Sequence, residues 1–77
     1  MGTGEIATQI AALNKADLAF RLAEWQCQEA DTDSEQRRYA KASLRAAMQR
    51  AFIFAWLEKH QITLKKMNGE YVPRDYN

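Results

Sequence analysis

The stretch Asp31-Thr32-Asp33-Ser34-Glu35 decides the fold, because it separates two long segments, 5–30 and 36–60, that contain neither glycine nor proline. Within this stretch, Thr32 and Glu35 have the three-residue spacing of a capping box, in which two side chains satisfy the free amide groups at a helix start. The sequence therefore predicts a helix over about residues 4–30, a turn at 31–33 and a second helix over about 33–60.

Apolar residues recur at helical spacing in the first segment, in the order Ile6, Ile10, Leu13, Phe20 and Cys27. Steps of three, four and seven residues are typical of an amphipathic helix. A second apolar set, interpreted as lying beside this stripe and widening it, comprises Leu18, Leu22 and Trp25. An alternative is a break near Asn14, which could cap a new helix start with Asp17 in its first turn.

The second segment is apolar on nearly all sides in its last half. Its inner side is predicted to comprise Tyr39, Leu44, Met48, Phe52, Ala55 and Trp56. Further apolar residues, Ile53, Phe54 and Leu57, spread onto the other sides. One partner helix cannot cover such a segment, so we expect a second copy or the C-terminal tail to cover it.

After His60 the pattern changes to β-prone residues around Asn68-Gly69, a strong signal for a tight hairpin turn. An irregular extended tail over 62–77 is the alternative. An isolated hairpin is marginal in water, so a hairpin here would have to place apolar side chains against the helices. The candidates for that contact are Ile62, Leu64, Tyr71 and Val72.

Length and composition indicate one small folded domain over residues 1–77. The chain has 77 residues, of which 47% are hydrophobic and 27% charged. So short a chain has a thin core and often gains stability from association, so we expect a homodimer. A single cysteine, Cys27, excludes an internal disulfide, and Cys27 with His60 cannot form a usual zinc site.

The same features exclude several classes of function. The longest apolar run, 51–57, is far shorter than a membrane span, and the start of the chain does not resemble a signal peptide. We therefore expect a cytoplasmic protein with no membrane contact. No phosphate-binding loop or hydrolase motif is present, so we expect a protein that is not an enzyme and uses no cofactor or metal.

Charge is segregated along the chain although the net charge is only +1. Between positions 37 and 50 there is no acid, and the basic residues are Arg37, Arg38, Lys41, Arg45 and Arg50. One interpretation is a helix face that contacts nucleic-acid phosphates. The other is a solvated face that also pairs with acids of the first helix, namely Asp17, Glu24 and Glu29.

Aromatic residues supply the other candidate surface, since aromatic and arginine side chains dominate the energetics of protein interfaces. Most of the aromatic residues are expected in the core, but a chain this small cannot hide all of them. The residues predicted to bind a partner are Phe52, Phe54, Trp56, Tyr71 and Tyr76.

The predicted fold class is mainly all-α: an αα-hairpin that pairs into a four-helix-bundle-like dimer and carries a short extended or β-hairpin tail. Over about residues 5–58, two helices of similar length joined by an acidic turn, it resembles in outline the Rop-type RNA-binding hairpin dimers. This resemblance is architectural, and no functional residue is carried over.

Two functional hypotheses follow. The first is a small non-catalytic interaction protein that docks on and modulates a larger protein, of the accessory or inhibitory kind that phages and mobile elements encode. The alternative is a dimeric nucleic-acid-binding regulator that uses the basic face of the second helix.

Overall fold

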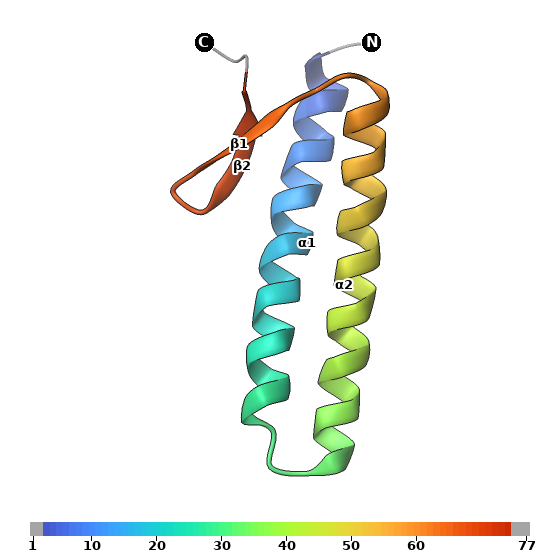
Figure 1. Ribbon diagram of the computed structural model, residues 1–77, viewed down its shortest axis with the longest axis vertical. Coiled ribbons are helices and arrows are strands. Elements are labelled where there is room, and N and C mark those ends of the chain that lie inside the picture. The colour runs from blue at the N-terminus through green and yellow to red at the C-terminus, as the bar shows by residue number, and fades with distance from the viewer. Residues whose placement is uncertain (1–2, 75–77) are drawn as a thin grey trace.

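The computed structural model describes residues 3–74 as two antiparallel helices followed by a β-hairpin (Figure 1). Helix α1 spans Thr3–Glu29 and helix α2 spans Asp33–Lys59. Strands β1, Leu64–Met67, and β2, Glu70–Pro73, form the hairpin. The prediction of a mainly helical αα-hairpin with a short tail is confirmed, and between the two tail alternatives the structure has the β-hairpin.

The turn between the helices contains the predicted cap. The Thr32 hydroxyl oxygen accepts a hydrogen bond from the Glu35 backbone N–H at 3.1 Å, and the hydroxyl donates to Glu35 Oε1 at 3.1 Å. Asp33 and Glu35 also place negative charge in the first turn of α2, where the helix dipole favours it. The start of α2 is thus determined by local chemistry.

Helix α1 continues without interruption through Asn14, so the alternative of a break there is wrong. The Asn14 side chain does not cap a helix but binds β2. Its amide donates to the Tyr71 carbonyl at 3.0 Å, and its Oδ1 accepts from the Tyr71 N–H at 2.7 Å. One side chain therefore satisfies both backbone groups of Tyr71 and attaches the hairpin to α1.

Helix α2 ends in a Schellman motif without the usual glycine. Gln61 has a positive φ of 59°, the Gln61 N–H donates to the Glu58 carbonyl, and the Ile62 N–H donates to the Leu57 carbonyl at 2.9 Å. Ile62, the next residue, packs against the core that contains Leu57. The motif reverses the chain, so that the β-hairpin lies beside α1 (Figure 1).

The turn of the β-hairpin has positive φ at both central residues, 54° at Asn68 and 82° at Gly69, as a type I′ turn requires. The antiparallel register pairs Lys66 with Tyr71 and Met67 with Glu70. This register places Lys66 and Tyr71 beside α1, where each makes contacts described below.

The core lies at the end of the molecule that carries the β-hairpin. Its buried members are Ile10, Leu13 and Leu57. Packed against them are Ile6, Ile53, Phe54, Trp56, Ile62, Leu64 and Tyr71. The Phe54 and Tyr71 rings meet edge to face with centroids 5.4 Å apart. The expectation that Ile62, Leu64 and Tyr71 pack against the helices is therefore confirmed.

Two sequence-based interpretations of the helix faces are wrong. The predicted inner residues Leu44, Met48 and Phe52 are exposed, and Ala46, Ile53 and Leu57 face α1 instead. The second apolar set of α1, Leu18, Leu22 and Trp25, does not widen the inner stripe but is also exposed. In both helices the side that faces the other helix carries one member of an ion pair, Asp17 in α1 and Arg50 in α2.

Candidate interaction surfaces on the outer helix faces

Asp17 of α1 is buried, with 2% of its surface exposed, and it forms an ion pair with α2. Arg50 Nη1 donates to Asp17 Oδ1 at 2.8 Å. Arg21 Nε lies 3.2 Å and Lys66 Nζ 3.8 Å from Asp17 Oδ2. The carboxylate thus joins α1, α2 and β1 at one point.

Arg50 is held further by Phe20, since its guanidinium carbon lies 4.2 Å from the centre of that ring. Burial alone would raise the pKa of Asp17, but the hydrogen bond from Arg50 and the charges of Lys66, Arg21 and Arg50 outweigh it. The pKa of Asp17 is consequently held below its ordinary value of 3.8, and the side chain is ionised at neutral pH.

Once Arg50 points inward, an apolar row of α2 must point outward. Met48 and Phe52 each lie two positions from Arg50, and helical residues that are two positions apart point about 200° away from each other around the axis. The outer row of α2, defined as Leu44, Met48 and Phe52, is 63%, 54% and 74% exposed in that order. Such a contiguous row of large apolar side chains is characteristic of an interaction site.

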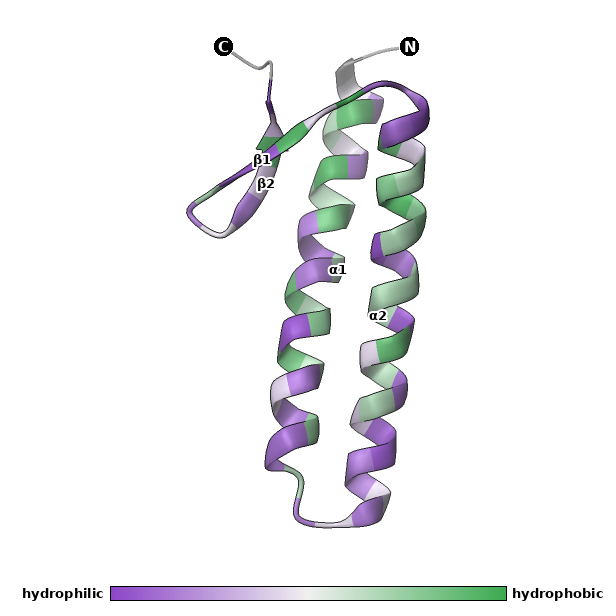
Figure 2. Ribbon diagram, viewed as in Figure 1, coloured by the Kyte–Doolittle hydropathy of each residue, from purple (hydrophilic) through white to green (hydrophobic). Residues whose placement is uncertain are grey.

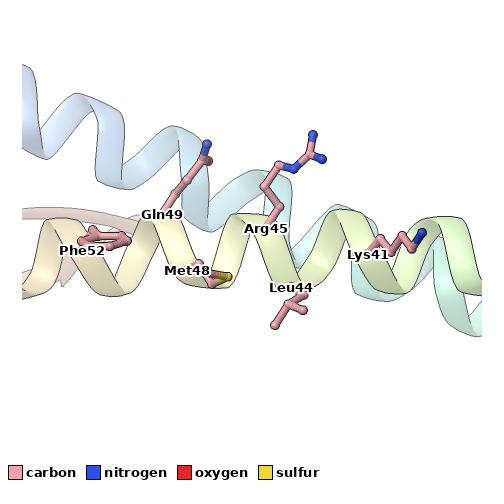
Figure 3. A pocket seen from close by; sticks show the side chains of 6 residues that line it. All are labelled: Lys41, Leu44, Arg45, Met48, Gln49 and Phe52. Atoms are coloured by element: carbon pink, nitrogen blue, oxygen red, sulfur yellow. The ribbon is translucent and has the colours of Figure 1, made fainter.

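The outer row of α2 lines a shallow hollow together with Lys41, Arg45 and Gln49 (Figure 3). Arg45 and Gln49 project to one side of α2, while Leu44 projects to the opposite side (Figure 3). The surface therefore combines apolar anchors with a basic and polar rim, and all six residues come from a single helix.

A second hollow lies nearer the turn and is basic. Ser34, Arg37, Arg38 and Lys41 line it. Arg38 lies over the ring of Tyr39 at 5.0 Å and donates to its hydroxyl at 3.2 Å. Among the described residues, no acidic side chain lies within ion-pair distance of these three basic groups.

Helix α1 also has an outer row, defined as Leu18, Leu22 and Trp25. Leu18 and Leu22 each lie two residues from Phe20, which faces Arg50 of α2. By the same helical geometry, they point away from α2. The αα-hairpin thus carries two exposed apolar rows, one on each helix, on the side that faces away from the other helix.

The structure places Phe52 and the five basic candidate residues in three groups. Phe52, predicted to bind a partner, shares a hollow with Lys41 and Arg45, predicted to bind nucleic acid. Arg37 and Arg38 line the basic hollow beside it. Arg50 is separate, because Asp17 and Phe20 engage it.

The other aromatic candidates lie in or near the core. Phe54 and Tyr71 contact each other, and the Trp56 ring lies against His60 at a tilt of 53° with centroids 4.2 Å apart. All three pack against the buried core. Tyr76 lies outside the described residues.

Sequence reasoning missed the outer rows as surfaces, although a signal was present. In α1, Lys15, Leu18, Leu22, Trp25 and Glu29 are spaced by three, four, three and four residues. In α2, Lys41, Leu44 and Met48 repeat this spacing. A second heptad-like repeat, out of phase with the buried one, indicates a helix with two contact faces.

Residues 3–74 contain neither a metal-binding cluster nor a membrane-spanning helix. In that range no three His, Cys, Asp or Glu side chains come together as ligands for a metal ion. Neither described helix combines the length and apolar character needed to cross a membrane. Comparison with family models, curated proteins and solved structures found no match.

Proposed function

We propose that this protein is a non-catalytic interaction protein that docks the outer row of α2 into an acid-rimmed apolar groove of a larger protein. By occupying that groove, it modulates its partner. The observation that carries the proposal is the exposure of Leu44, Met48 and Phe52 beside Lys41 and Arg45 on one helix face.

The apolar part of the surface suits a helix-in-groove contact. Leu44, Met48 and Phe52 follow one another at four-residue intervals. Anchors at such intervals are how an amphipathic helix fills a hydrophobic groove. Phe52 supplies a large rigid anchor, and Met48 adapts to irregular surfaces.

The charge of the surface indicates the chemistry of the partner. Lys41 and Arg45 border the outer row of α2, and no acid occurs between positions 37 and 50. A basic rim is complemented by an acidic one, which raises association rates and disfavours basic partners. The partner groove is therefore expected to be apolar at its base and to carry Asp or Glu at its edges.

The test is photo-crosslinking from a benzoylphenylalanine placed at Gln49, in the cells that naturally contain this chain. We expect one dominant cross-linked protein, with the cross-link mapping by mass spectrometry to an apolar groove edged by acidic residues. Met48→Asp should abolish the product, because it buries an unpaired charge of the wrong sign in the contact.

The matched control is Met67→Asp on the β-hairpin, since Met67 and Met48 are the same residue type and are 52% and 54% exposed. This variant should retain the cross-link. Equal loss with both variants, or a cross-link that survives Met48→Asp, would contradict docking through the outer row of α2.

A second candidate, a nucleic-acid-binding regulator, is favoured by the basic hollow of Ser34, Arg37, Arg38 and Lys41. Its test is fluorescence anisotropy of labelled duplex DNA and structured RNA over a range of salt concentrations. If phosphate contacts bind the nucleic acid, Arg38→Ala with Arg45→Ala should reduce the slope of log affinity against log salt by about two. Absence of binding at low salt would remove this candidate.

A further inference from the structure

The outer row of α1 takes no part in the proposed docking through α2. Leu18, Leu22 and Trp25 are 61%, 52% and 59% exposed. They lie on the side of α1 that faces away from α2, so α2 does not cover them. Three large side chains so exposed on one helix face indicate an interface.

The two ends of this row carry opposite charges. Lys15 lies three residues before Leu18, and Glu29 lies four residues after Trp25. Lys15, Leu22 and Glu29 are seven residues apart and so share one face. Neither Lys15 nor Glu29 forms an ion pair with another described residue.

A face with a positive end, an apolar centre and a negative end is complementary to itself when reversed. If two copies of α1 pair antiparallel about Leu22, Lys15 of each copy lies near Glu29 of the other. A parallel pairing would bring like charges together at both ends, which is unfavourable. The outer row of α2 lacks this property, because Lys41 and Arg45 border it without an acid.

We infer that the outer row of α1 binds the same row of a second copy, in antiparallel orientation, to form a two-fold symmetric homodimer. A two-fold contact of this kind is closed, so it produces dimers and no larger assemblies. Each interface residue occurs twice, so a substitution acts on both halves of the contact.

The arrangement has a consequence for the rest of the molecule. The outer faces of α1 and α2 point in opposite directions, so a dimer formed through α1 leaves both copies of the α2 row uncovered. The dimer then presents two docking rows on its two far sides, and a partner with two matching grooves would bind with increased avidity. The dimer itself does not depend on docking through α2.

The experiment is sedimentation velocity of the full chain over a wide range of concentration, with circular dichroism to verify helicity. The wild type is expected to change from 8.9 kDa to twice that mass as concentration rises. Leu22→Asp should raise the dimer dissociation constant at least about thirtyfold, the effect of losing one interface hot spot. Leu44→Asp, a matched change on α2, should leave it unchanged.

Charge exchange tests the orientation without altering the apolar row, and it stays informative if Leu22→Asp reduces helicity. Lys15→Glu alone and Glu29→Lys alone should each weaken the dimer roughly fivefold by placing like charges together. A chain with both changes, or an equimolar mixture of the two single variants, should recover wild-type dimerisation.

Other outcomes would overturn the inference. The inference is wrong if the wild type stays monomeric at every concentration. It is also wrong if Leu44→Asp dissociates the dimer and Leu22→Asp does not. Assemblies larger than the dimer would instead indicate that α1 packs on α2 of the next copy. In that case Lys41→Glu, and not Lys15→Glu, would restore the association that Glu29→Lys weakens.

Discussion

At the end of the molecule that carries the β-hairpin, Leu13 and Leu57 are 0% and 1% exposed, whereas farther toward the turn the buried apolar residues are small, namely Ala46 in the middle of α2 and Ala23 in α1. Figure 2 shows the same contrast, with apolar colour concentrated toward the β-hairpin and polar colour around the turn. Two helices alone bury only small side chains between them. Large side chains become fully buried only where a third element, the β-hairpin, covers them.

The comparison predicts that stability is concentrated at the end with the β-hairpin. Leu13→Ala should lower the free energy of unfolding by about 3 kcal/mol, since it leaves a cavity where the surroundings are tightly packed. Chemical denaturation followed by circular dichroism measures the change. Leu44→Ala, the same change at an exposed position, should cost less than about 0.5 kcal/mol; similar losses would contradict the comparison.

The ion-pair cluster around Asp17 joins the three elements at this end, so Asp17→Asn should cost about 2 kcal/mol after allowance for the partial exposure of its partners. The pKa of Asp17 is lower in the folded state, so below the ordinary value the unfolded chain binds more protons. The stabilisation that the ionised Asp17 contributes is therefore complete above about pH 4, and it is lost as the pH falls through the pKa of Asp17 in the folded state.

Denaturation of both proteins between neutral and acidic pH tests this dependence. The difference in stability between the wild type and Asp17→Asn should shrink as the solution is acidified, because protonation of Asp17 removes the charge that the variant lacks at all pH values. A difference that is constant with pH would show that the ionised carboxylate is not what joins the helices.

The attachment of the β-hairpin to α1 should depend on Asn14. Asn14→Ala leaves the N–H and the carbonyl of Tyr71 without their side-chain partner, and we expect a loss of about 1.5 kcal/mol. Hydrogen exchange at the Tyr71 amide should accelerate strongly, whereas exchange near Ala23, in the half of α1 toward the turn, should change little. Uniform acceleration along the chain would instead mean that the two ends unfold together.

The smallest effect is expected at the turn. Thr32→Ala removes the N-cap of α2 and should cost about 1 kcal/mol. Thr32→Ser retains the hydroxyl and serves as the control, and both variants can be compared by thermal unfolding. Local exchange should increase over the first turn of α2 while the Tyr71 amide stays protected.

Sequence reasoning predicted the elements well because their signals are local. The Thr32 cap, the Asn68-Gly69 turn and the apolar spacing each act within a few residues. It failed on the orientation of the helices, since it placed Leu44, Met48 and Phe52 inside. Pairing of the basic residues with Asp17 was one of the two interpretations, and Arg50 does bind Asp17, 33 positions earlier in the chain. The pair was placed on a solvated face, however, whereas Asp17 is buried between the helices.

The same limit applies to the candidate site. Phe52 was predicted to bind a protein partner and Lys41 and Arg45 to bind nucleic acid, and the structure places all three around one hollow. Phe54 and Tyr71 were predicted as partner-binding residues from their chemistry, but they contact each other. Residue type identified side chains able to bind a partner, while burial decided which of them are accessible.

The amino-acid sequence by itself determined two helices, the turn that joins them and the hairpin that follows, because capping, periodicity and turn chemistry depend on neighbouring residues. Only the tertiary structure decided which apolar row of each helix is buried. Each helix carries two such rows, and the choice between them depends on the pairing of Asp17 with Arg50 and on the cover that the β-hairpin provides.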